Sequence, residues 1–201
     1  MQPEHGLHDL QLPPPAKRHD TRKFDREKGY VETSDTCIFR NTVRDIGTVA
    51  NALGPHGIKF EQEYHDVGHP CNLRLCMDTG RFKAPIFIRF IVGILGDIGP
   101  EVDNLIFLKR TADRLFGDDY RWSVPGAGGA QMGLAAAAQM GGNVHVGLKD
   151  SLQITRGKPP TSNAEQVTKI RHIVQDLGRE IATPDEARAI LGLKRGDQVA
   201  F

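Results

Sequence analysis

Apolar and polar positions alternate along the chain in a way that predicts strands and helices in regular succession from about residue 36 onward. Five short apolar runs indicate strands, and apolar residues recur at helical spacing after each of them. The predicted strands are Cys37–Phe39, Ile58–Tyr64, Pro85–Val92, Tyr120–Val124 and Val144–Leu148. The predicted helices are Val43–Leu53, Gly68–Met77, Pro100–Leu115, Gln131–Met140, Ser162–Leu177 and a short one from Thr183.

Helix-end signals support these boundaries. Ser162 or Asn163 is typical of an N-cap, and Thr183-Pro184 has the order of an N-cap followed by a first-turn proline. Regular alternation of strand and helix predicts an α/β fold with a parallel sheet and right-handed crossovers. Five such units fit either an open doubly wound sheet or five-eighths of a closed barrel, and periodicity does not choose between them.

Composition separates residues 1–30 from the rest. That segment holds three consecutive prolines and mixed charges with few apolar side chains, so we expect a flexible polar arm before a folded part at 31–201. The chain has 201 residues, whereas a complete (β/α)₈ barrel needs roughly 250. A barrel-like reading therefore predicts only part of a barrel.

Charge and cysteine content narrow the class of protein. Lys+Arg number 26 against 25 for Asp+Glu, which gives no basic field for nucleic acid or an anionic membrane. The longest apolar run, Ala84–Leu95, is too short to span a bilayer, and the N-terminus has no secretory pattern. Three cysteines without a CxxC pair favour free thiols in a reducing compartment. We expect a cytoplasmic protein.

Polar residues near the carboxyl ends of the predicted strands are the candidates for chemistry, because ligand sites of parallel sheets lie there. Glu61 and Glu63 are two apart and hence on one face of their strand. Arg89 interrupts the next, otherwise apolar, strand and is a plausible partner for either glutamate. The alternative is that both carboxylates are ordinary surface groups on an edge strand.

Further candidates follow at the other strand ends. Asn41 ends the first strand, and Ser123 ends a later one before the glycine-rich turn 126–129, which fits either phosphate binding or tight helix packing. Lys149 and Asp150 close the last strand, which also contains His145. His65 and His69 have the spacing of a helical metal pair, but a glycine lies between them and no third ligand is evident.

Several long motifs resemble the β-keto acid cleavage enzyme family in one register. They are Glu61-Gln62-Glu63 with Asp66-Val67-Gly68-His69, Trp122-Ser123-Val124 with Gln131, Gly141 through Leu152, and Ser162-Asn163-Ala164-Glu165 through Arg188. The resemblance runs from about Tyr30 to Leu193. It implies a (β/α)₈ barrel, usually oligomeric, that converts a 3-keto acid and an acyl-CoA, as the 3-keto-5-aminohexanoate cleavage enzymes of lysine fermentation do. It also implies a zinc ion that polarises the keto oxygen, held by two histidines of an early strand and a glutamate of the last.

The resemblance carries over unevenly. Asp150 matches the catalytic aspartate, and Glu61 and Glu63 match paired glutamates of which one is expected in the active site. Against the family pattern, His145 stands at an arginine position and Lys149 at the position of the zinc-binding glutamate. Arg89 likewise replaces a glutamine and Gly129 an arginine, and no HxH pair occurs anywhere in the chain.

These departures predict an N-terminally truncated relative with no bound catalytic zinc and negligible cleavage activity. Asp150, Glu61 and Glu63 remain the catalytic candidates, and His145, Ser123 and Asn41 the substrate-binding ones. Three readings stay open. The chain is a fragment of an enzyme, a non-catalytic half-barrel that pairs with itself or a full-length relative, or a metal-free enzyme that uses His145, Lys149, Asp150 and the two glutamates.

Overall fold

The computed structural model describes residues 36, 38, 40–94, 97–125, 137–155 and 157–195. The chain divides into two compact units, residues 1–45 and residues 46–201. In the first unit, Thr42 and Asp45 form two reciprocal hydrogen bonds at the start of helix α3 (Val43–Leu53). The side chain of each residue accepts a hydrogen bond from the backbone N–H of the other. A single 3₁₀ turn, η2 (Gly54–His56), follows helix α3.

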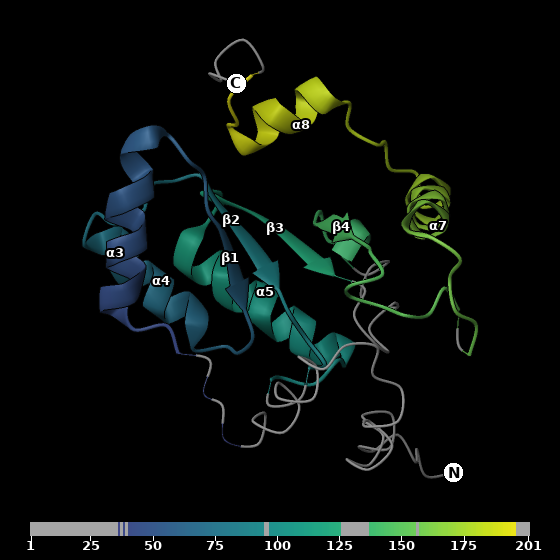
Figure 1. Ribbon diagram of the computed structural model, residues 1–201, viewed down its shortest axis with the longest axis horizontal. Helices are drawn as coiled ribbons and strands as arrows, with labels where there is room; N and C mark the ends of the chain where they lie inside the picture. Colours follow the sequence, from purple (N-terminus) through teal and green to yellow (C-terminus); the bar gives the residue numbers. More distant parts are fainter. Residues whose placement is uncertain are drawn as a thin grey trace, which may run out of the picture. The chain divides into compact units, whose positions relative to one another are not determined.

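The second unit contains one four-stranded parallel sheet in the order β1-β2-β3-β4 (Figure 1). The strands are β1 (Glu61–Tyr64), β2 (Ile86–Phe90), β3 (Tyr120–Pro125) and β4 (Asn143–His145). Helix α4 (His69–Asp78) connects β1 to β2, and helix α5 (Val102–Phe116) connects β2 to β3. Helices α7 (Asn163–Asp176) and α8 (Pro184–Leu191) follow β4. Spatial order thus equals sequence order, as in consecutive β/α units.

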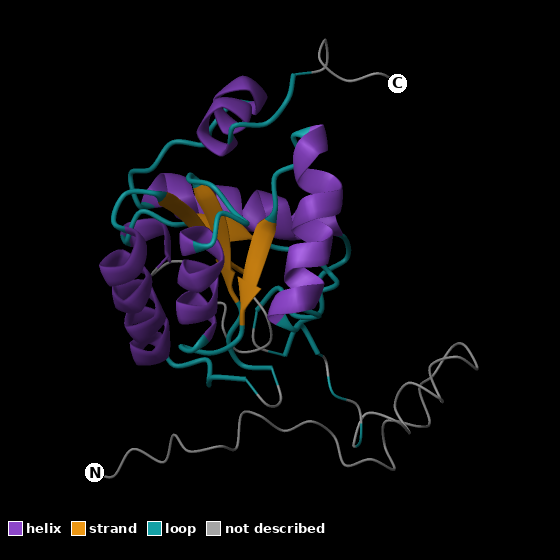
Figure 2. Ribbon diagram, turned by 90° about the vertical axis from the view of Figure 1, so that its left-hand side faces the viewer, coloured by secondary structure: helices purple, strands orange, loops and turns teal. Residues whose placement is uncertain are grey.

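The core lies on one face of this sheet, where helices pack against it (Figure 2). Along β2, Ile86, Ile88 and Phe90 are buried and the two residues between them are only partly buried. The buried side chains join apolar residues of α4, α5 and α7, namely Leu73, Cys76, Leu105, Leu108, Ala112, Phe116, Ile170 and Val174. The opposite face carries most polar residues of the strands, whereas Gln62 lies on the core face because it is paired with the buried Ile88.

Most predicted elements are confirmed. Strands β1, β2 and β4 are shorter than predicted, and β3 extends one residue further, to Pro125. Helix α3 has the predicted bounds, and the N-caps of α7 and α8 are Ser162 and Thr183. Of the predicted helix at 131–140, residues 137–139 are helical and 131–136 lie outside the described residues. No described helix is long and apolar enough to cross a membrane.

The first predicted strand is the exception. Ile38 is not in a strand and is 84% exposed, while Cys37 and Phe39 lie outside the described residues. The described sheet therefore has four strands where the sequence predicted five. A run of only three apolar residues followed by Arg40 and Asn41 offers few side chains to bury, which makes it a weak strand signal.

The cap of α8 should make this helix sensitive to acid. Glu186 accepts hydrogen bonds from the backbone N–H of Thr183 at 2.8 Å and from its hydroxyl at 2.8 Å. These bonds hold the pKa of Glu186 below its ordinary value of 4.5. Because the folded pKa is depressed, the stabilisation is present above 4.5 and is lost as pH falls through the folded value. We expect amide-exchange protection of α8 to be constant above about pH 5 and to decrease below about pH 4.5, whereas Glu186→Gln should abolish this dependence.

Candidate active site

The sheet places the polar candidates on one face. Residues paired across parallel strands project on the same side, and Glu63 is paired with Arg89, which is paired in turn with Ser123. Glu61 lies two residues before Glu63, so it shares that face. His145 is paired with Pro125, two residues beyond Ser123, and so belongs to the same face. Four strands thus contribute to a single polar surface.

Arg89 is held between the two glutamates. One guanidinium nitrogen lies 3.1 Å from Oε1 of Glu63, and the other forms an ion pair with Glu61. The side chain of Arg89 is 16% exposed, against 27% for Glu61 and 46% for Glu63. The predicted pairing is confirmed for both carboxylates. The edge-strand alternative is also partly right, because β1 is an edge of the described sheet.

Ser123 adds a buried hydroxyl to this surface. The residue is 3% exposed, and its Oγ has no hydrogen-bond partner among the described residues. Nε of Arg89, the register partner of Ser123, is likewise buried without a partner in the described part of the chain. Buried polar atoms are rarely left unpaired, so these two atoms are exceptions within the described residues.

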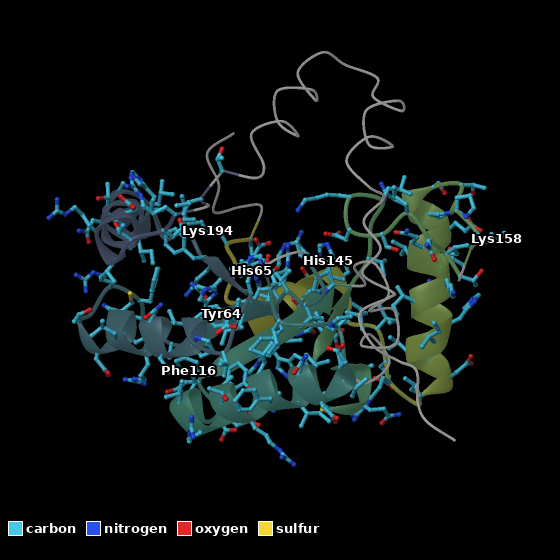
Figure 3. All side chains as sticks on the ribbon, turned by 90° about the horizontal axis from the view of Figure 1, so that it is seen from below. Tyr64, His65, Phe116, His145, Lys158 and Lys194 are labelled. Carbon is cyan, nitrogen blue, oxygen red and sulfur yellow. The ribbon has the colours of Figure 1, made fainter. Side chains whose placement is uncertain are left out.

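His145 and Asp150 form a direct pair at the end of β4. Nε2 of His145 lies 2.9 Å from Oδ2 of Asp150, with side-chain exposures of 35% and 14%. Figure 3 shows His145 and His65 on one side of the sheet, while Tyr64 and Phe116 lie on the side of α5. Both residues are candidates from the sequence, which placed them in one possible metal-free site, but their direct contact was not predicted.

The loop that carries Asp150 is anchored to α7 by three side chains three residues apart. Asn163 accepts the N–H of Leu148 at 2.8 Å, and the buried Gln166 donates to the carbonyl of Ser151 at 2.8 Å. Lys169 donates to the carbonyl of Ile154. Residues three apart are neighbours on a helix surface, so successive anchors of α7 reach loop positions that also advance by three. These three contacts were not predicted from the sequence, although polar residues recur at positions 163, 166 and 169.

The residues present do not fit the zinc site that the resemblance implies. Lys149 occupies the glutamate position and is exposed, so it places an ammonium where the family has a carboxylate. Within the described ranges there is no group of three or more His, Cys, Asp or Glu residues that could hold a metal ion. We therefore derive no catalytic step through zinc.

His65 and His69 have partners other than a metal. Nδ1 of His65 lies 2.7 Å from Oδ2 of Asp97, and the backbone N–H of His65 donates to Nδ1 of His69 at 3.2 Å. Asp97 was not identified from the sequence. Because Nδ1 of His69 accepts a hydrogen bond, its neutral ring carries the proton on Nε2. Burial raises the pKa of the neighbouring Tyr64 hydroxyl. This cluster joins the loops that follow β1 and β2.

Two candidates are not among the residues of the described sheet. Asn41 is exposed and belongs to the unit of residues 1–45, not to the unit that contains the sheet. The glycine-rich turn 126–129, including Gly129, lies outside the described residues.

Comparison with known proteins agrees with the motifs. The family model of the beta-keto acid cleavage enzymes matches residues 12–193, a match that begins upstream of Tyr30. A 3,5-dioxohexanoate:acetyl-CoA acetone transferase from Paraburkholderia graminis is 43% identical over 197 residues, which are 98% of this chain and 64% of that protein. A 3-keto-5-aminohexanoate cleavage enzyme from Fusobacterium nucleatum is 32% identical over 94% of this chain and 68% of its own length. The chain thus spans less than two thirds of the first relative. By the extent of the family match, this chain belongs to the beta-keto acid cleavage enzyme family.

Proposed function

We propose that this chain is the carboxyl-terminal part of a (β/α)₈ barrel of the type that cleaves a 3-keto acid with an acyl-CoA, and that the chain itself lacks this cleavage activity. One observation carries the proposal: the family's site positions Glu61, Glu63 and Asp150 come together with Ser123 on or beside one polar face of the sheet. The names of the relatives, which include acetyl-CoA and keto acids, support this substrate class.

Each group on this face has a role that follows from its surroundings. Arg89 fixes the two glutamates and lowers their mutual repulsion. The unpaired Ser123 hydroxyl is a hydrogen-bond donor for an oxygen of the keto acid. The pair of His145 and Asp150 supplies acid–base chemistry. We also propose a cytoplasmic location, which the free thiols of Cys71 and Cys76 support, and a homo-oligomer.

The 201 residues alone should turn over negligibly and bind no catalytic zinc. No HxH pair is present, Lys149 replaces the metal-binding carboxylate, and about a third of the Paraburkholderia graminis relative has no counterpart in this chain. We expect purified chain to contain less than 0.1 equivalent of zinc, as an order-of-magnitude bound, and to release no acyl-CoA product from acetyl-CoA and a 3-keto acid. One equivalent of zinc together with turnover would refute this expectation.

Complementation tests the positive part of the proposal. The unmatched third of the Paraburkholderia graminis relative is produced as a separate fragment and mixed with this chain or with its Lys149→Glu variant. We expect zinc binding and acyl transfer only with the Lys149→Glu variant, since that change restores the carboxylate. Failure of a folded, associated mixture of fragment and Lys149→Glu chain to transfer acyl groups would count against the proposed activity.

The second candidate function is a non-catalytic half-barrel that pairs with itself or a full-length relative. The favouring observation is that β1 hydrogen-bonds only to β2 within the described sheet, which leaves an open parallel edge. Inactivity of the Lys149→Glu chain in a folded, associated mixture with the fragment would favour this function. Acyl transfer by that mixture favours the first.

A further inference from the structure

The hydrogen bond between His145 and Asp150 determines which ring nitrogen of the histidine is free. An ionised carboxylate only accepts hydrogen bonds, so Nε2 of His145, 2.9 Å from Oδ2 of Asp150, carries the ring proton. In a neutral imidazole the other nitrogen is then an acceptor with an open lone pair. Nδ1 of His145 has no hydrogen-bond partner within the described residues, and the side chain is 35% exposed.

The carboxylate of Asp150 is held in place by its surroundings. Asp150 is 14% exposed and sits in a turn in which its backbone N–H donates to the carbonyl of Gly147 at 3.0 Å. A Cβ added at Gly147 would lie 3.4 Å from Oδ2 of Asp150 and 3.7 Å from Oδ1 of Asn163, which are ordinary contact distances, so the turn packs against both side chains. Helix α7 holds the same loop through Asn163 and Gln166. A fixed acceptor orients the ring that donates to it.

We propose that His145 is the proton-transferring base of this chain, with Nδ1 as the accepting atom and Asp150 as the positioning residue. The substrate class is a carbon acid whose C–H lies next to a ketone. The proposal deepens the proposed function, on which it rests for the identity of this carbon acid. In the family resemblance an arginine stands at position 145, and a guanidinium cannot accept a proton. The histidine therefore gives this chain a base that the resemblance does not assign.

The step balances without a further reactant. A C–H bond breaks at the carbon that joins the ketone to the carboxylate, and an N–H bond forms at Nδ1 of His145. The electron pair of the C–H bond passes to the ketone oxygen, which gives an enolate. The imidazolium formed in this step lies against the carboxylate of Asp150, which stabilises its charge. The enolate carbon then attacks a thioester carbonyl, a C–C bond forms, the C–S bond breaks and the CoA thiolate leaves. Attack of that thiolate on the original ketone breaks the older C–C bond, and the carbanion released takes back the proton from Nδ1.

Deuterium exchange at C2 of acetoacetate in the full 201-residue chain tests the base directly, because exchange needs no acyl-CoA. We expect the wild type to accelerate exchange above the buffer rate and His145→Gln to lose about 100-fold of that acceleration. Asp150→Ala should lose roughly tenfold, because the ring remains but is no longer oriented. His172→Gln removes an exposed histidine of α7 and should change nothing.

A spectroscopic signature separates positioning from a merely structural role. The Nε2 proton of His145 should be visible as a downfield ¹H resonance that disappears in Asp150→Ala, while the amide spectrum of the folded chain persists. A visible Nδ1 proton in place of it would overturn the proposal, as would unaccelerated exchange in the wild type. If the mixture of fragment and Lys149→Glu chain exchanges deuterium but transfers no acyl group, the proposed function is wrong and the role of His145 as base stands. If acyl transfer persists after His145→Gln, the role of His145 is wrong and the proposed function stands.

Discussion

Phe90→Ala is expected to lower the free energy of unfolding by about 4 kcal/mol, because it empties the centre of the core. Phe90 is 0% exposed at the carboxyl end of β2, and its ring lies 5.6 Å from that of Trp122 and 6.4 Å from that of Tyr64. These rings come from three adjacent strands, so no single neighbour can move to fill the space. Urea denaturation followed by tryptophan fluorescence and circular dichroism measures the loss as a lower midpoint.

Two variants make the expectation specific. Phe107→Ala removes the same side chain from an exposed position of α5, where the residue is 52% exposed, and should cost less than about 1 kcal/mol. Phe90→Leu retains most of the buried volume and should cost about 1 kcal/mol. If Phe90→Ala is too unstable to fold, Phe90→Leu still measures how much the side chain at position 90 contributes to the free energy of unfolding. Equal losses at Phe90 and Phe107 would contradict the core described here.

The same burial pattern explains how much of the fold could be predicted from sequence. Strand β2 and helix α5 were identifiable because each buries one face along its length. Their apolar residues therefore recur in the sequence at strand spacing and helix spacing, respectively. The caps Ser162 and Thr183 were identifiable because N-capping is local chemistry. Strand ends were less predictable: Ile58 belongs to the apolar run before Tyr64 but lies outside β1 and is 44% exposed. Whether an apolar residue is paired depends on a neighbouring strand that sequence does not place.

The site was predictable where one strand or one register fixes it. Glu61 and Glu63 share a face by alternation alone, and Arg89 was expected to neutralise them because an unpaired buried cation is costly. The contact of His145 with Asp150 was not predictable, because it depends on the turn between them. Asp97 was missed for a similar reason, since it reaches His65 from a loop 32 positions away. Contacts that depend on loop conformation leave no periodic trace in the sequence.

Arg89→Met is expected to lower the free energy of unfolding by about 2 kcal/mol at neutral pH. The change leaves the carboxylates of Glu61 and Glu63 on one face without the guanidinium that now contacts both. Loss of one member of a fully buried ion pair costs more, but the 46% exposure of Glu63 lets water screen part of the repulsion. Urea denaturation of both proteins at equal ionic strength gives the difference.

The matched control is Arg121→Met, which removes a cation from the same face of the neighbouring strand. Arg121 is exposed and, among the described residues, donates only to the backbone carbonyls of Asp118 and Tyr120, so its loss should cost less than about 0.5 kcal/mol. Adding Glu61→Gln and Glu63→Gln to Arg89→Met should restore most of the lost stability, since it removes the repulsion that Arg89 offsets. If the triple variant is no more stable than Arg89→Met, the guanidinium contributes through packing of its stem and not through its charge. The polar face would then not depend on this charge balance, and the role assigned to Arg89 in holding the two glutamates would fail with it.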